Sequence, residues 1–171
     1  MKKVILLFAL LVGTSGISSA QKFALIDMEY ILKNIPAYEM ANEQLNQISK
    51  KWENEVNDVK QQADEMYKTY QSELVFLSAE MKTKRENEIV DKEKEAQELK
   101  RKYFGPDGEL YKKRASLMKP IQDEIYDAVK KISKEKNLDV IVDRASAASI
   151  IYASPKIDIS NEILSELGYA K

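Results

Sequence analysis

The sequence predicts a predominantly helical α+β protein, in which a small β-sheet body carries one long antiparallel helical hairpin, a coiled-coil arm. Three observations support this fold class. About a hundred mostly polar residues carry apolar side chains at the spacing of an α-helix. This stretch is interrupted near its middle, and short apolar runs typical of strands stand before and after it. We therefore expect the body from residues 21–36 and 137–171, and the arm from residues 37–136.

Residues 1–20 have the features of a secretory signal peptide. Lys2 and Lys3 form a basic start, residues 4–12 are a nine-residue apolar run, and the segment ends with small residues at 18–20. Nine apolar residues are about half of what a bilayer span needs, which favours a cleaved signal over a membrane anchor. The mature protein of 151 residues is expected to be exported.

The composition argues against catalysis. The chain has no Cys and no His, which removes disulfides, histidine acid–base or triad chemistry and histidine metal sites. The mature chain carries 25 basic and 28 acidic side chains, and this negative balance disfavours nucleic-acid binding. We expect no enzymatic activity, no cofactor and no metal. The enzymatic alternative is paired-acid chemistry at Asp139 and Asp143, which flank a predicted strand.

The N-terminal part of the body is predicted to be one strand and one short helix. Residues Lys22–Ile26 are mostly apolar and β-compatible, which is typical of a strand. Asp27 can cap a helix over Met28–Ile35 with its carboxylate. Pro36 is expected to stop this helix or to redirect the chain.

The outgoing helix of the arm has one narrow apolar seam. Its apolar residues recur in steps of three and four, and ten steps cover 36 residues, a mean of 3.6. A mean of 3.5 would indicate a supercoil, so we expect a nearly straight helix of about 40 residues, or ~60 Å. A seam this narrow fits one partner helix. The seam residues are Ala41, Leu45, Ile48, Trp52, Val56, Val59, Ala63, Met66, Tyr70, Leu74 and Leu77.

The apex of the hairpin is predicted near residues 75–79. The four consecutive apolar residues at 74–77 do not fit a single helical stripe, so at least one is exposed at the tip. Ser78 can cap a new helix, with Glu80 in its first turn. The alternative is one helix that continues through Ser78.

The returning helix is predicted to start at Ala79 and to be interrupted at Gly105–Gly108, where the sequence GPDG is typical of a turn. Helix resumes near Glu109, and Pro120 is expected to kink or restart it. The returning seam is thin before the interruption and stronger after it. Its residues are Met81, Ile89, Ala96, Leu99 and Tyr103, followed by Met118, Ile121, Ile125, Val129 and Ile132.

The C-terminal part of the body is predicted to add two strands and a helix. Leu138–Val142 and Ser149–Ala153 are apolar and rich in β-branched residues, as strands are. Asp158 or Ser160 is expected to cap the last helix, and Gly168 to end it.

Oligomerisation is expected because the body is small. Its 51 residues bury too little surface to hold so long an arm, and a strand at 149–153 would leave an apolar edge exposed. Several copies that share one sheet would solve both problems. The predicted interface residues are Phe23, Leu25, Val140, Val142, Ile150 and Tyr152.

Four motifs occur in a characteristic order around the charged hairpin: FALIDMEYIL at 23–32, LDVIVD at 138–143, IIYAS ending at Ser154, and IDISNEIL at 157–164. This arrangement resembles the Skp/OmpH family of periplasmic chaperones over essentially the whole mature chain. The resemblance implies a homotrimer, with a β-rich body and three helical arms around a cavity. It also implies ATP-independent holding of unfolded outer-membrane proteins in the periplasm or beside the outer membrane.

The charge of the arm departs from that of the strongly basic family members. Residues 37–76 carry 4 basic and 8 acidic side chains, and residues 79–104 carry 8 basic and 7 acidic ones. The cluster Lys112, Lys113 and Arg114 lies where the family has an arginine-rich stretch proposed for lipopolysaccharide. The resemblance makes this cluster a candidate lipopolysaccharide contact, and a solvated helix face is the alternative.

A holdase needs many weak contacts, which adaptable Met and amphipathic Tyr side chains can supply. Of the candidates, those on the seam can instead be purely structural. The function weighed against a holdase is a trimeric coiled-coil structural or adaptor protein of the cell envelope, which binds one partner and ignores unfolded chains. The candidate client-binding residues are Met66, Tyr67, Tyr70, Phe76, Leu77, Met81, Tyr103 and Phe104.

Overall fold

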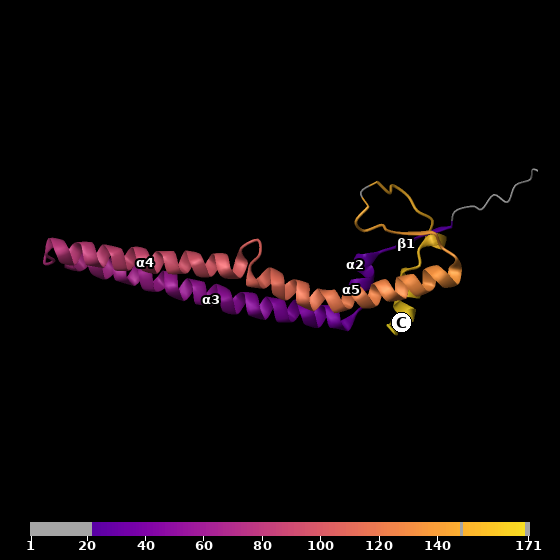
Figure 1. Cartoon of the computed structure of the whole chain (residues 1–171), viewed down its shortest axis with the longest axis horizontal. Coiled ribbons are helices and arrows are strands. Elements are labelled where there is room, and N and C mark those ends of the chain that lie inside the picture. The colour runs from indigo at the N-terminus through magenta and orange to yellow at the C-terminus, as the bar shows by residue number, and fades with distance from the viewer. Residues whose placement is uncertain (1–21, 148, 170–171) are drawn as a thin grey trace, which may run out of the picture. The chain divides into compact units, whose positions relative to one another are not determined.

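The computed structural model describes residues 22–147 and 149–169, and the predicted signal peptide at 1–20 lies outside this range (Figure 1). The chain divides into two compact units. One, the body, comprises the residues up to Ile31 and from Asp127 onwards, and the other, the arm, comprises Leu32–Tyr126. Each unit is described by itself.

The body is built on a two-stranded parallel sheet. Strand β1 (Phe23–Ile26) pairs with β2 (Val140–Asp143), with Phe23 opposite Val140 and Ile26 opposite Asp143. Helix α2 (Met28–Lys33) follows β1, and the 3₁₀ turn η1 (Pro155–Ile157) and helix α6 (Ser160–Glu166) follow β2. The buried apolar side chains are Ala24, Leu25, Ile26, Ile31, Ala128, Ile132, Ile159, Ile163 and Leu164.

The predicted helix cap at Asp27 is confirmed, whereas the prediction of Asp158 or Ser160 as the cap of α6 is wrong, because Ile159 is the N-cap residue and makes no side-chain cap bond. The Asp27 carboxylate accepts a hydrogen bond from the backbone N–H of Tyr30 at 2.8 Å, at the start of α2. The Asp158 carboxylate accepts one from the backbone N–H of Ser160 at 2.9 Å, at the start of α6. Gly168 follows the end of α6 with φ of 83°, the left-handed conformation that suits glycine after a helix.

The predicted third strand at Ser149–Ala153 is wrong. Residues 150–154 form a loop, in which Ile151 is fully exposed. The apolar, β-branched composition favours a strand, but β-propensity depends on context and does not by itself decide whether a segment pairs with a sheet. One edge of β1 is taken by β2 and the other is bridged at Leu25 by Asp158, and residues 150–154 do not pair with the remaining edge of β2. The prediction of a three-stranded sheet is thereby corrected to two strands.

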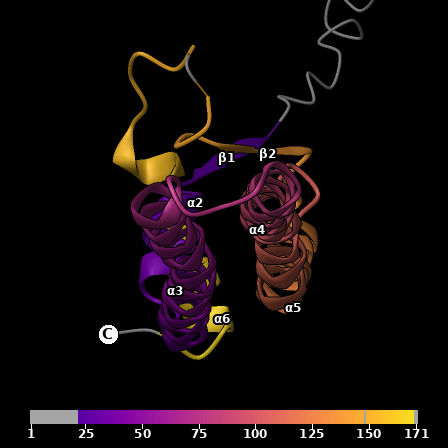
Figure 2. The same ribbon diagram turned by 90° about the vertical axis from the view of Figure 1, so that its left-hand side faces the viewer.

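The predicted helical hairpin is confirmed. Helix α3 (Pro36–Glu73) has 38 residues, which corresponds to about 57 Å, and α4 (Ala79–Phe104) lies antiparallel beside it (Figures 1 and 2). Pro36 occupies the first turn of α3, where its missing N–H costs nothing. All eleven predicted seam residues of the outgoing chain are buried or half-buried.

The apex also forms where the sequence places it. Helix α3 ends at Glu73, and the Ser78 hydroxyl accepts a hydrogen bond from the N–H of Met81 at 3.3 Å, as a cap of α4. The alternative of one helix through Ser78 is excluded. The residues between Glu73 and Ala79 therefore form a short connection at the end of the hairpin.

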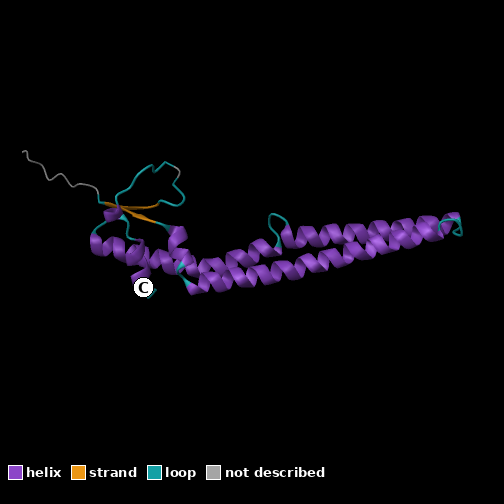
Figure 3. Ribbon diagram, turned by 180° about the vertical axis from the view of Figure 1, so that it is seen from behind, coloured by secondary structure: helices purple, strands orange, loops and turns teal. Residues whose placement is uncertain are grey.

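The returning chain is interrupted at Gly105–Gly108 and then resumes as α5 (Glu109–Lys136), as Figure 3 shows. The expectation that Pro120 restarts the helix is wrong, because α5 runs continuously through it. Proline removes one backbone hydrogen bond from the helix interior. Apolar side chains on both sides of it, half-buried Leu117 and buried Ile121, keep the helix packed and offset that loss.

Candidate binding surfaces

The tip of the arm exposes large apolar side chains. Val75 is 82% and Phe76 is 86% exposed, whereas Leu77 is half-buried. These residues stand in the connection between α3 and α4, where neither helix covers them. Of the predicted client-binding residues, Phe76 therefore lies open to solvent and Leu77 lies partly in the seam.

Tyr70 lies in the seam and is 7% exposed. Its hydroxyl donates a hydrogen bond across the hairpin to the carboxylate of Glu86. This bond, the burial of the ring and the charge of Glu86 all raise the pKa of the Tyr70 hydroxyl. The ring is covered by its own chain, and contact of Tyr70 with a client stays a prediction.

Tyr103 also lies in the seam. Its ring stacks on Trp52, with ring centroids 4.7 Å apart and planes within 3° of parallel. Its hydroxyl donates a hydrogen bond of 2.7 Å to Glu55, and this bond is the main reason why its pKa is raised. Phe104 meets the Tyr103 ring edge-on at 6.3 Å. These residues tie the last turn of α4 to α3.

The remaining predicted client-binding residues lie between the tip and the middle of the arm. Tyr67 is 53% and Met81 is 50% exposed, and Met66 is half-buried. Met66 lines a shallow groove between α3 and α4, with Thr69 and Ile89. The structure thus brings Met66 to an accessible groove and leaves Tyr67 and Met81 on open surface.

The basic cluster lies in the first two turns of α5. Lys112 is paired with Glu109, with 3.1 Å between the ammonium nitrogen and the carboxylate oxygen. Lys113 is half-buried and Arg114 is exposed. Because an acidic neighbour offsets one of its three charges, the cluster offers less positive charge to an anion than its sequence indicates.

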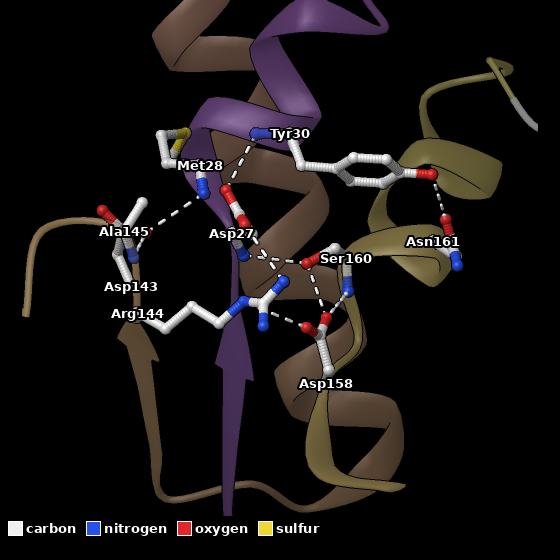
Figure 4. Close-up of polar contacts among 9 residues, drawn as sticks. All are labelled: Asp27, Met28, Tyr30, Asp143, Arg144, Ala145, Asp158, Ser160 and Asn161. Carbon is white, nitrogen blue, oxygen red and sulfur yellow. Dashed lines mark hydrogen bonds and ion pairs between the residues drawn. The ribbon is translucent and has the colours of Figure 1, made fainter. Parts of the chain in front are cut away.

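In the body, one polar network joins the ends of β1 and β2 to the start of α6 (Figure 4). The Arg144 guanidinium lies 3.0 Å from the Asp27 carboxylate and 3.3 Å from the Asp158 carboxylate. Ser160 Oγ accepts a hydrogen bond from the Asp27 N–H at 2.8 Å and donates one to Asp158 at 2.6 Å. The network therefore holds three segments together that are far apart in the sequence.

The alternative of paired-acid chemistry at Asp139 and Asp143 has no support in this geometry. A separation of four residues along a strand corresponds to about 13 Å. Asp139 accepts a hydrogen bond from the Lys22 N–H, and Asp143 from the N–H groups of Met28 and Ala145. Burial raises the pKa of Asp143, but hydrogen bonds from Met28, Ser146 and Ala145 outweigh it, so that the pKa is lowered. Both carboxylates hold backbone in place.

The predicted interface residues of the body differ in accessibility. Phe23 and Val140 are 54% and 53% exposed, Tyr152 is 84% exposed, and Val142 and Ile150 are half-buried. Leu25, in contrast, is 3% exposed within its own chain. Its side chain belongs to the core of the body, and its part in an interface stays a prediction.

Two general features complete the description of the surface. Within residues 22–147 and 149–169, no group of three or more acidic side chains is arranged to hold a metal ion. None of the helices in the described part of the chain combines the length and the apolar character that a membrane crossing requires.

The sequence profile of the OmpH-like outer membrane proteins matches residues 22–167, which include both units and all the surfaces described above. The chain belongs to this family. The predicted family resemblance is thereby confirmed.

This OmpH-like chain is similar to two known proteins. A protein of Aquifex aeolicus (strain VF5), described as uncharacterized, is 28% identical over 160 residues, which cover 94% of each chain. The crystal structure of an OmpH-like protein of Caulobacter crescentus CB15, described as a candidate outer membrane chaperone, matches with a TM-score of 0.70. That match has 11% identity and covers 87% of this chain and 85% of the other, so it shows the fold alone.

Sequence reasoning placed the aromatic seam residues of the OmpH-like hairpin but missed their partners across it, above all Glu55 and Glu86. A usable signal was present, because a hairpin with a known apex pairs residues whose numbers have a constant sum. The numbers of Trp52 and Tyr103 add to 155, and those of Tyr70 and Glu86 add to 156. The network around Arg144 had no such signal, because nothing local indicates which carboxylates it meets.

Proposed function

We propose that this OmpH-like chain is an ATP-independent holdase of the periplasm, which binds unfolded outer-membrane β-barrel proteins and prevents their aggregation on the way to the outer membrane. The observation that carries this proposal is the exposure of Val75 and Phe76, at 82% and 86%, which are the most exposed large apolar side chains of the arm. Exposed apolar groups of this kind mark interaction sites when they are not scattered singly.

Weak contacts along the arm would add to those of the tip. Tyr67 and Met81 are half exposed, and Met66 borders a groove, so an extended chain could meet apolar surface at several points. Met is adaptable in such contacts, since its side chain can fit partners of different shape. The charged side chains between these points would keep the arm itself from aggregating. Holding a client in this way uses no catalytic group.

The proposed holdase is a homotrimer. Nine apolar side chains are buried in the described part of the body, a small core for a chain with a 38-residue helix in its arm. Phe23, Val140 and Tyr152 leave apolar surface beside the sheet that sister copies would cover. Trimeric assembly would set three arms around a space for one unfolded client.

Contact with lipopolysaccharide stays a prediction for Lys112, Lys113 and Arg114. The ion pair between Lys112 and Glu109 leaves Arg114 as the exposed charge best suited to a phosphate, because a guanidinium can bind it with two hydrogen bonds. We therefore assign lipopolysaccharide a secondary place among the partners.

The double substitution Val75→Ser and Phe76→Ser tests the proposed function. We expect it to weaken suppression of aggregation several-fold, because it removes the two most exposed apolar side chains of the tip. The measurement is light scattering of a urea-unfolded outer-membrane β-barrel protein diluted into buffer with the chaperone. Native mass should be unchanged, since these side chains lie outside the body.

Val90→Ser with Tyr111→Ser is the matched control, because it removes an exposed valine and an exposed aromatic ring from the shaft of the arm. It should lose far less activity than the tip variant. Equal loss in both variants would show that the tip has no special part. Failure of the unmodified protein to hold several unrelated unfolded barrels would instead favour the envelope adaptor.

A further inference from the structure

An aromatic contact stands directly beside the interruption of the returning chain. The rings of Trp52 and Tyr103 are stacked, and Phe104, the last residue of α4, contacts Tyr103 edge-on. The next residue, Gly105, begins the non-helical segment. Helix α3 runs past this point without a break. The outgoing side of the hairpin is therefore one continuous helix, whereas the returning side is interrupted at residues 105–108. This interruption is the joint of the arm, and the stack lies beside it.

The joint is a closed turn. The N–H of Gly105 donates to the Arg101 carbonyl at 2.9 Å, and the N–H of Gly108 donates to the Gly105 carbonyl at 2.9 Å. A Cβ at Gly105 would lie 2.4 Å from the backbone carbonyl oxygen of Arg101. A Cβ at Gly108 would lie 2.8 Å from the backbone carbonyl oxygen of Tyr103. The two glycines thus allow α4 and α5 to end and begin close together, with no helical hydrogen-bond ladder across the gap.

Elsewhere α4 is held weakly. Of its 26 residues, Ile89 and Ala96 are the buried ones, and neither belongs to the last two turns. An aromatic pair in contact shifts an equilibrium by up to roughly tenfold, in addition to the apolar area that it buries. The stack and the bond from Tyr103 to Glu55 are therefore the main attachments of the end of α4 to α3.

We propose that the stack of Tyr103 on Trp52 is a latch and that Gly105–Gly108 is its hinge. With the latch closed, Trp52 is half-buried and one of its faces is covered by the Tyr103 ring. When the latch opens, the end of α4 swings away from α3 and uncovers this aromatic face of Trp52. An unfolded, aromatic-rich client segment binds this surface, which rests on the holdase function proposed above. Such a segment favours the open state because it binds that state more tightly.

The latch can be tested without any client. Tyr103→Ala should speed hydrogen exchange of the amides at 97–104 by about tenfold, with a smaller change at 82–89. Trp52 is the one tryptophan of the whole sequence, so quenching of its fluorescence by acrylamide reports the same event and should rise. Tyr103→Phe keeps the stack but loses the bond to Glu55, so its exchange and quenching should lie between those of the unmodified protein and those of Tyr103→Ala. Exchange and quenching that are unchanged in Tyr103→Ala would overturn the latch.

The control is Tyr111→Ala, which removes a tyrosine that is 60% exposed on α5, beyond the hinge. It should leave both measurements unchanged. If it accelerates exchange at 97–104 as much as Tyr103→Ala does, the effect belongs to general loosening of the arm and the latch is refuted.

If opening of the latch is coupled to client binding, breaking the stack should strengthen binding. A purely structural contact would give equal or weaker binding. Tyr103→Ala should bind a urea-unfolded, tryptophan-free β-barrel protein several-fold more tightly, since opening no longer opposes binding. Equal or weaker binding would overturn the coupling. If neither the unmodified protein nor any variant binds the client, both the holdase function and the coupling of the latch to a client are refuted. The hydrogen-exchange data would still decide whether the stack is a latch.

Discussion

Replacing Ile163 by Ala is expected to unfold the body. Ile163 has no exposed surface and lies in the middle of α6, whose N-terminal turn is tied to the polar network of Arg144. Removing three buried carbons costs about 2 to 5 kcal/mol, because a cavity remains where they packed. A body of this size has a total stability of only a few kcal/mol, so most of it is expected to be lost. Urea unfolding and hydrogen exchange of β1 measure the change.

Ile151→Ala is the matched control, because it removes the same atoms from a side chain that is 100% exposed. Its effect on the free energy of unfolding should stay within about 0.5 kcal/mol at low protein concentration. A cost for Ile163→Ala that equals the cost for Ile151→Ala would show that α6 does not form the core of the body.

Gly108→Ala is expected to destabilise the arm, because the added methyl group meets three backbone atoms of the turn. The new Cβ would lie 2.8 Å from the Tyr103 oxygen and 2.9 Å from the nitrogen and the oxygen of Gly105. All three are backbone atoms, so no flexible side chain can move aside and the turn itself has to shift. Overpacking of this kind costs about 1 to 3 kcal/mol. Thermal unfolding followed by circular dichroism measures it.

Asp107→Ala in the same turn provides the comparison, since Asp107 is exposed. It should change the melting temperature little. If the two variants melt together, the tight geometry of the turn is not what holds α4 and α5 in register.

The arm could be predicted from the sequence because its signals are local. The period of the seam, the cap at Ser78 and the turn chemistry of GPDG each involve residues within a few positions of one another. Pro120 was the exception. Local chemistry favours a restart of the helix there, but packing of the apolar residues on both sides keeps α5 continuous.

The body could be predicted less well because its structure depends on distant pairs. Arg144 meets Asp27, which is 117 positions away, and the Ser160 hydroxyl meets the Asp27 N–H, which is 133 positions away. The apolar run at 149–153 has the composition of a strand, but composition alone does not decide whether a segment pairs with a sheet. Burial of Leu25 likewise follows from what the rest of the chain places over it.

The central claim is that a small body assembles with sister copies, so that the arms together hold one unfolded client. Native mass measurement, with and without a urea-unfolded outer-membrane β-barrel protein, tests it most directly. The account predicts a species of three mature chains that gains the mass of one client. A stable single chain that gains no mass when the client is added would contradict it.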